Sequence, residues 1–317
     1  MKNVNTSVKT ENKFSSWRKM VKGDFRRNKS LYFLLLPVLA FYFIFHYVPM
    51  YGALMAFTEY TPTLGIFGSQ WIGFRHFTDF FSSPSFGAVL GNTLRISLST
   101  LLFNFPAPII LALLLNELRS QKLSKTIQNA AYLPHFISLV VVCGLVKTFT
   151  KDSGIITQFL TLFGMPKVSL LNYPKYFTPV YVATTVWQET GWNSIIYLAA
   201  LTGVDAALYE AAQIDGANRW KQTWNITLPS ILPTIVTMLI LNIGSILNVG
   251  YEKILLLYND ATLEVADVVS TFVYRKGLLE QSWGYSAAVN IFNSVINLIL
   301  LFSANTISKK LNDTSLW

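Results

Sequence analysis

Charged side chains are scarce in this sequence. Only 13% of its 317 residues are Asp, Glu, Lys or Arg, whereas 52% are hydrophobic and the mean hydropathy is +0.41. Soluble domains carry about 25% charged residues. The shortage of charge therefore excludes an ordinary soluble protein and indicates a chain that lies in a lipid bilayer.

The groups that enzymes and metal sites require are also missing. The one cysteine, Cys143, lies in an apolar stretch, which excludes an internal disulfide and predicts a small buried side chain. His46, His76 and His135 have no ligand partners at metal spacing, so we expect packed or interfacial rings. No phosphate-binding G-x-x-x-x-G-K-[ST] motif and no nucleophile beside a base are present. We expect a non-catalytic chain that binds no cofactor itself.

Long apolar runs dominate what is present. Crossing about 30 Å of hydrocarbon takes roughly 20 mostly apolar residues in a helix. Barrel strands need only about 10 residues, so runs of this length predict an all-α polytopic membrane protein with six transmembrane helices. The predicted spans are Leu31–Phe57, Thr93–Asn116, Ile127–Phe149, Tyr176–Thr202, Pro229–Tyr251 and Ser286–Ile307.

The distribution of Lys and Arg predicts the orientation. Sixteen of the 25 basic residues fall on the side of the N-terminus, nine of them before Leu31, against seven on the other side. Cytoplasmic segments carry this excess, so both termini are expected in the cytoplasm. The net charge of +9 thus reflects the orientation in the membrane and attraction to anionic lipid headgroups. It gives no reason to expect nucleic-acid binding.

The domain organisation follows from the same pattern. Residues 1–30 form a basic tail, and the first apolar run after it is too long for the core of a cleavable signal peptide. Residues 31–317 form one transmembrane domain in the cell membrane. Its five-helix core runs from about residue 88 to residue 307.

The most informative segment, residues 204–229, joins the fourth and fifth predicted spans on the cytoplasmic side. Its sequence is VDAALYEAAQIDGANRWKQTWNITLP. Tyr209–Ile214 favours a helix, Gly216 can supply a positive φ, and Asn218–Ile226 can resume as a second helix. Small alanines allow another protein to approach closely, and Glu210 offers a carboxylate to a partner's arginine. The alternative is a helical hairpin that only caps the bundle.

This segment resembles the EAA loop of ABC importer permeases, whose pattern is E-A-A, three residues, G, nine residues and I-x-L-P. Glu210-Ala211-Ala212, Gly216 and the run from Ile226 to Pro229 match it. In that family the loop is the coupling helix that docks in a cleft of the ATPase subunit. The resemblance implies that five residues transmit closure of the ATPases to the membrane helices: Glu210, Ala211, Ala212, Asp215 and Gly216.

Other stretches resemble carbohydrate-importer permeases, in particular the group named for LplB, which is associated with complex and often acidic oligosaccharides. They are residues 31–60, Trp187 with Gly191-Trp192-Asn193, and ADVVSTFVYR at residues 266–275. The resemblance implies a second related permease, two ATPase subunits that hold ATP and Mg, an extracellular substrate-binding protein, and a sugar or oligosaccharide substrate.

Charge inside a predicted span is costly, which draws attention to Glu189 in the middle of the fourth span. Aromatic rings stack on sugar C–H surfaces, and amides and carboxylates accept sugar hydroxyls. The segment around Glu189 is therefore a candidate for the substrate path, although a carboxylate bonded to the partner subunit is an equal alternative. The candidates in this segment are Trp187, Gln188, Glu189, Trp192 and Asn193.

The fifth predicted span carries a second candidate. Asn242, Ser245, Asn248 and Glu252 fall within about one third of a helix circumference, so they should face a cavity or a partner helix. Hydrogen bonding between helices, without a transport role, explains the stripe equally well.

Outside these two candidates, Arg95 and Lys147 lie near outer span ends and can reach the headgroups; a role with acidic substrates is the alternative. An importer of this type would work by alternating access about a substrate at the interface of two permeases. Importers of non-sugar solutes, ion-coupled secondary transporters and membrane-embedded enzymes remain alternatives. The ion-coupled transporter would need several central acids and the enzyme a catalytic constellation.

Overall fold

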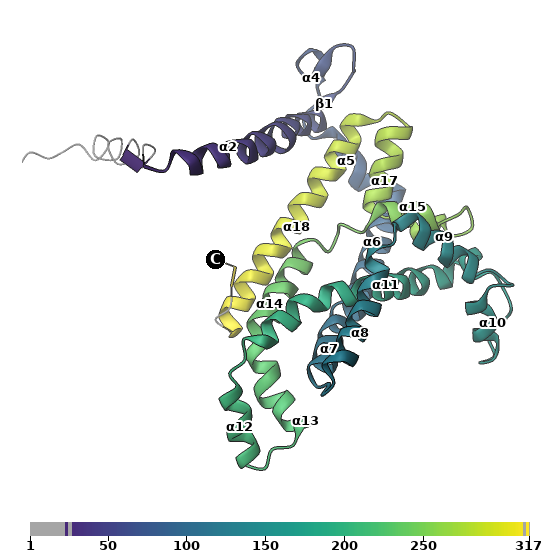
Figure 1. Ribbon diagram of the computed structural model, residues 1–317. Helices are drawn as coiled ribbons and strands as arrows, with labels where there is room; N and C mark the ends of the chain where they lie inside the picture. Colours follow the sequence, from purple (N-terminus) through teal and green to yellow (C-terminus); the bar gives the residue numbers. More distant parts are fainter. Residues whose placement is uncertain (1–22, 25–26, 313–314, 317) are drawn as a thin grey trace, which may run out of the picture. The chain divides into compact units, whose positions relative to one another are not determined.

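A computed structural model describes residues 23–24, 27–312 and 315–316 (Figure 1). Apart from one pair of two-residue strands, every regular element in this part of the chain is helical. The expected all-α fold class is thus confirmed. The chain divides into two compact units, Met1–Leu54 and Met55–Trp317, each of which is described by itself.

The first unit is built around one apolar helical segment. Helix α2, Lys29–Tyr42, continues through the π-helical turn η1, Phe43–Tyr47, into α3, Val48–Met50. Pro37 lies inside α2, and no residue of α2 is buried within the chain. Only the last residues of the predicted tail, 1–30, are described, so its cytoplasmic location stays a prediction.

The second unit holds the remaining helices. A 3-10 helix, η2 (Tyr51–Phe57), leads into it. Its two strands pair antiparallel, with Thr58 opposite Trp71. In chain order its elements are β1 (Thr58–Glu59), α4 (Gly65–Gly68), β2 (Gln70–Trp71), α5 (Arg75–Ser82), α6 (Pro84–Asn104), α7 (Pro106–Asn116), α8 (Gln121–Tyr132), η3 (Leu133–Phe136), α9 (Leu139–Phe149), α10 (Ile155–Thr161), η4 (Leu170–Asn172), α11 (Pro174–Thr202), α12 (Ala206–Ile214), α13 (Arg219–Gln222), η5 (Thr223–Thr227), α14 (Leu228–Gly244), α15 (Tyr251–Leu257), α16 (Leu263–Ala266), α17 (Val269–Tyr274), η6 (Arg275–Leu279) and α18 (Trp283–Asn312).

Helices long and apolar enough to cross a membrane overlap each of the predicted spans. The continuous ones are Lys29–Phe57, Pro84–Asn116, Arg219–Gly244 and Trp283–Lys310. Two further spans are bent pairs: α8 and η3 meet α9 at 98°, and α11 meets α12 at 71°. The described residues thus hold up to six spans when each bent pair counts as one, which agrees with the number predicted.

The third predicted span is not one straight helix. The expected run Ile127–Phe149 breaks between η3 and α9. Pro134 lies at the start of η3, and Ser138, which is extended, begins α9 by accepting a hydrogen bond from the Val141 amide at 3.4 Å. A proline and a serine N-cap four residues apart end one helix and start the next, which explains the bend.

The fifth span is shifted toward the N-terminus relative to the prediction Pro229–Tyr251. Its helix runs over Arg219–Gly244, because the π-helical turn η5 precedes Pro229 without ending the helix. After Gly244 the backbone closes tight turns, since Ser245 N–H donates to the Asn242 carbonyl at 3.2 Å. The expectation that Ser245 and Asn248 continue a helical stripe was therefore wrong.

Helix α11 lies at the centre of the second unit and packs on α6, α7, α8 and α14. Gly191 permits the close approach to α8, because a Cβ there would lie 2.0 Å from the Ala131 carbonyl oxygen. Cys143 is 1% exposed in the core that α11 shares with α9 and α15, as expected for a small buried side chain. Helices α14 and α18 lie side by side, with α12 and α13 at the far end of α14 from α15 (Figure 1).

Candidate coupling loop and substrate pathway

The segment between α11 and α14 has the helix, turn and second helix expected from its sequence. Asp205 begins α12 by accepting a hydrogen bond from the Ala207 amide at 2.9 Å. Gly216 has φ 74°, a conformation that favours glycine, and the Ala217 amide closes the end of α12 on the Ala212 carbonyl at 2.8 Å. The second helix, however, continues without a break into the fifth span.

One contact within the loop and one with the end of α7 hold it in place. The Tyr209 hydroxyl and Thr227 Oγ1 lie 2.9 Å apart, which ties α12 to the base of α14. Arg219 Nη1 forms an ion pair with Glu117 at 3.0 Å and donates to the Glu117 carbonyl at 3.2 Å, which ties α13 to the end of α7. A push on the loop can therefore reach α7 and α14.

The outward surface of the loop carries the predicted coupling residues. Glu210, Ala211, Asp215 and Gly216 are exposed, and Ala212 is half-buried. No hydrogen bond or ion pair holds the Glu210 carboxylate within the described part of the chain. Sequence analysis missed two apolar neighbours on the same helix: Leu208 is 49% exposed and Ile214 is 87% exposed.

Glu189 has a partner within the chain that the sequence did not reveal. His135 Nδ1 donates to Glu189 Oε2 at 3.1 Å, and the His135 ring stacks on Trp192 with centroids 4.6 Å apart and planes at 1°. His135 lies on η3, beside the break in the third span. Among the described residues no group of three potential ligands could hold a metal, so His135 acts here as a hydrogen-bonding and stacking side chain.

The other candidates near Glu189 do not share its surroundings. Trp187 lines an apolar cavity of about 820 Å³ between α9, α10 and α11, together with Val142 and Leu160. Gln188 is buried and Asn193 is half-buried. Successive residues on a helix differ by about 100°, so neighbours in the sequence point to different surfaces.

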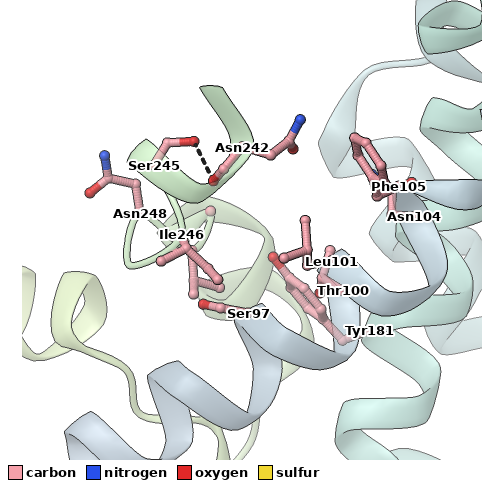
Figure 2. Close-up of a pocket in the computed structure, with 12 residues that line it drawn as sticks. Ser97, Thr100, Leu101, Asn104, Phe105, Tyr181, Asn242, Ser245, Ile246 and Asn248 are labelled. Atoms are coloured by element: carbon pink, nitrogen blue, oxygen red, sulfur yellow. Dashed lines mark hydrogen bonds between the residues drawn. The ribbon is translucent and has the colours of Figure 1, made fainter. Parts of the chain in front are cut away.

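The second candidate set does converge, on a polar pocket. Asn242, Ser245 and Asn248 line it, even though only Asn242 lies on a helix; Ser245 Oγ donates to the Asn242 carbonyl at 3.3 Å (Figure 2). The pocket has a volume of about 170 Å³. Its lining residues are Ser97, Thr100, Leu101, Asn104, Phe105, Tyr181, Asn242, Ser245, Ile246, Asn248, Val249 and Gly250.

Helix α6 supplies polar groups to this pocket that sequence analysis missed. Ser97 Oγ, Thr100 Oγ1 and Asn104 Oδ1 are buried and have no hydrogen-bond partner in the described part of the chain. Buried polar groups are nearly always paired, so these three groups are available to hydrogen-bond with water, a ligand or a partner helix. Their spacing of three and four residues within an apolar span was the available signal.

Asparagines on α18 hold the non-helical part of the pocket wall. Asn248 Oδ1 accepts hydrogen bonds from Asn293 Nδ2 at 2.9 Å and from Asn297 Nδ2 at 3.1 Å. Asn297 Oδ1 in turn accepts from the Leu247 amide at 3.2 Å. The segment after α14 is therefore fixed by side chains about 50 residues away in the sequence.

Two basic residues, Arg95 and Lys253, form hydrogen bonds within the second unit. The Arg95 guanidinium donates to the Val265 carbonyl at 2.7 Å and to Asn92 Oδ1 at 3.0 Å. The residue is exposed, but its guanidinium is bonded within the chain. Lys253, on α15 outside the candidate spans, is 6% exposed. Burial lowers the pKa of the Lys253 ammonium from 10.5 to about 8, against the smaller opposing effect of Cys143.

Comparison with known proteins identifies the chain. Residues 97–313 match the family model described as "binding-protein-dependent transport system inner membrane component". Protein LplB of Bacillus subtilis (strain 168) is 44% identical, over 98% of this chain and 96% of LplB. The polygalacturonan/rhamnogalacturonan transport system permease protein YteP of the same organism is also 44% identical, over 92% of this chain and 91% of YteP.

Solved structures agree with these relatives. A chain of a bacterial ABC transporter involved in the import of the acidic polysaccharide alginate has a TM-score of 0.84 and 43% identity, covering 92% of this chain and 99% of that one. A chain of the bacterial alginate ABC transporter in complex with an alginate pentasaccharide-bound periplasmic protein has a TM-score of 0.85. The chain belongs to the binding-protein-dependent transport system inner membrane components, the non-catalytic permease subunits of ABC importers.

Proposed function

We propose that this chain forms one half of the translocation path of an oligosaccharide importer and that residues 204–229 couple it to separate ATPase subunits. The observation that carries the proposal is the Glu210 carboxylate, exposed and unpaired in the described structure on a loop that is itself braced against α7 and α14. An unpaired acid at the rim of an exposed surface suits a bidentate arginine of another protein.

The rest of the loop supports docking. The small side chains of Ala211 and Ala212 allow another protein to approach α12 closely. Leu208 and Ile214 supply exposed apolar area on the same helix as the Glu210 carboxylate. Apolar contacts around a desolvated charged pair are what protein interfaces use for binding energy. In this proposal the loop and both termini lie in the cytoplasm, where the ATPases bind ATP and Mg.

A second, related permease completes the path. The polar pocket, at about 170 Å³, is smaller than the 300–1,000 Å³ typical of ligand sites. Ser97, Thr100 and Asn104 lack partners within the described chain. Both features are expected of a half-site, whose other wall a facing permease provides.

The cargo in this proposal is a carbohydrate, delivered by an extracellular binding protein. The names of YteP and of the alginate transporter refer to polysaccharide substrates, which supports this cargo. The lining of the polar pocket, with its hydroxyl and amide groups and one tyrosine, supports it as well. The Glu189, His135 and Trp192 group is a second candidate contact along the path. Transport proceeds by alternating access, in which ATP binding draws the ATPases together and the loops rock the two permeases.

The coupling role is tested by Glu210→Ala in the complete complex. We expect the ATPase to co-purify with the wild-type chain and to be lost from the variant, and ATP-driven oligosaccharide uptake in proteoliposomes to fall by about a hundredfold, the effect of removing a buried charge pair worth about 3 kcal/mol. The thermal stability of the variant chain should stay that of the wild type, since the Glu210 carboxylate pairs with none of the described residues.

Asp260→Ala is the matched control, because Asp260 is an exposed acid without a hydrogen bond or ion pair in the described structure. It should retain the ATPase and uptake. Retention of the ATPase and full uptake by Glu210→Ala would contradict the coupling role. Uptake that needs no nucleotide would contradict the proposed function as a whole, and ATP-driven uptake of only non-sugar solutes would contradict the cargo.

A further inference from the structure

Lys253 is a buried cation beside the polar pocket. Its side chain is 6% exposed, and its Nζ donates a hydrogen bond to Thr185 Oγ1 on α11 at 2.6 Å. The same ammonium lies 4.9 Å from the centroid of the Tyr181 ring. A hydroxyl and an aromatic face therefore hold the ammonium, and neither carries a negative charge.

Among the residues that the structure describes, no carboxylate forms an ion pair with this ammonium. Five ion pairs occur within the described residues, and none of them includes Lys253. Glu189 acts on it only from beyond ion-pair distance. An unpaired charge out of water costs several kcal/mol, so a carboxylate brought near this cation would be stabilised by it.

Tyr181 connects the ammonium to the pocket. The ammonium of Lys253 lies over the Tyr181 ring. The same side chain lines the pocket, beside Thr100 and Leu101 in Figure 2. Val249 and Gly250, which immediately precede α15, line the same pocket. Lys253 thus lies behind one ring and one short segment of the pocket lining, where water screens its charge less than at the surface.

We propose that Lys253 is a specificity-determining residue that favours oligosaccharides bearing carboxylates over neutral ones, an inference that rests on the proposed oligosaccharide import. The carboxylate of a uronic acid residue in the pocket supplies the missing negative charge. The unpaired groups of Ser97, Thr100 and Asn104 remain available for sugar hydroxyls. In this proposal the positive charge of Lys253 attracts the carboxylate, and Tyr181 lies between the ammonium and the pocket.

The competing explanation is that Lys253 only joins α15 to α11 through Thr185. Loss of such a joint would lower transport of every cargo equally. A charge selector, in contrast, changes the preference between two cargoes of the same length. The ratio of acidic to neutral uptake therefore separates the two roles, and the preference of the binding protein cancels when variants are compared.

The experiment uses proteoliposomes with the complete complex and ATP. The probes are alginate pentasaccharide and the same pentasaccharide with its carboxyl groups reduced to alcohols. We expect Lys253→Gln and Lys253→Met to lower the acidic-to-neutral uptake ratio by about tenfold, whereas Lys253→Arg, which keeps the charge, stays within about threefold of the wild type. An unchanged ratio in an uncharged variant that still transports overturns the proposal.

Failure of the proposed function would look different. A wild-type complex that takes up neither probe in an ATP-dependent manner refutes oligosaccharide import for these cargoes, and this inference with it. Uptake of both probes with a ratio insensitive to the charge at position 253 leaves the proposed function intact and removes only the inference.

A measurement on the wild type decides the case if neither uncharged variant assembles. Because burial lowers the pKa of Lys253 to about 8, the ammonium is charged at pH 7 and mostly neutral at pH 9. The acidic-to-neutral ratio should fall severalfold over that interval and stay constant in Lys253→Arg. A wild-type ratio that does not change overturns the proposal.

Other groups near Lys253 do not confuse this readout. The titratable or charged groups on the elements packed against α15 are Cys143 and Lys147 on α9, Tyr274 on α17, and Lys175, Tyr176, Tyr181, Glu189 and Tyr197 on α11. Helix α15 itself adds Tyr251 and Glu252. All of them are present in Lys253→Arg, so any change that they cause with pH appears in that variant too.

Discussion

The coupling loop and the polar pocket are built in opposite ways. Residues 204–229 are continuous in sequence, and the loop's internal hydrogen bonds, such as Tyr209 with Thr227, join residues at most 18 positions apart. The pocket gathers α6, α11 and the segment after α14, and the bonds that support it join residues 45 to 50 positions apart.

This difference has consequences for both stability and function. The loop exposes its functional groups and uses few of them for packing, so a substitution there should affect coupling more than folding. The pocket residues also hold helices together, so substitution there should affect folding and transport together. Substitutions in the two regions test this contrast, and Gly191→Ala, at the close contact between α11 and α8, gives the upper end of the stability scale.

Gly191→Ala should be the most damaging change. Its Cβ would lie 2.0 Å from the Ala131 carbonyl oxygen and 2.9 Å from the Tyr132 amide nitrogen, and backbone atoms cannot move aside as a side-chain end can. We expect a loss of about 3 kcal/mol in the free energy of unfolding, measured by denaturation of the purified complex. Gly144→Ala, with no atom within 4 Å of its Cβ, is the control and should not destabilise the chain.

Asn248→Ala should come second. It leaves the buried Nδ2 groups of Asn293 and Asn297 without their acceptor, at a cost of about 2 kcal/mol in the free energy of unfolding. Asn242→Ala is the comparison, because the Asn242 side chain, within the described structure, donates only to the Met238 carbonyl of its own helix. Equal stability of the two variants would show that the α18 asparagines do not support the pocket wall.

Gly216→Ala should have a smaller effect on stability and a larger one on transport. With φ at 74°, an alanine is strained by about 1 kcal/mol in this conformation. Gly203→Ala, where no positive φ is required, should be neutral. If ATP-driven uptake by Gly216→Ala falls no further than its stability predicts, the turn has no coupling role.

Arg219→Ala should change stability least. The pair with Glu117 is exposed, 57% and 39% at its two side chains, so solvent screens it. A double-mutant cycle with Glu117→Ala should give a coupling energy below about 1 kcal/mol. A larger value would mean that α13 and the end of α7 form a rigid joint, and the loop would then resemble the pocket rather than contrast with it.

Prediction from the sequence succeeded where the signal was local. The spans, the helix-turn-helix with its break at Gly216, and the burial of Cys143 all follow from runs of neighbouring residues. The bend at Pro134 and Ser138 was also visible locally but was outweighed by the apolar run around it. The orientation in the membrane stays a prediction, as do the roles of the loop residues.

The candidate pathway was only partly predictable because its partners are distant in sequence. Asn242, Ser245 and Asn248 were found for a helical stripe that does not exist, yet turns bring them to one pocket. Glu189 bonds to His135, 54 positions away, and Lys253 bonds to Thr185, 68 positions away. The spacing of residues in the sequence does not reveal either pair.

The sequence by itself determined the class of molecule, because apolar length, the distribution of charge and a continuous loop motif are properties of neighbouring residues. The tertiary structure alone decided which polar groups meet in the bilayer-spanning body. A charge or amide in an apolar helix must find a partner, and which partner it finds depends on how the helices pack rather than on the helix that carries it.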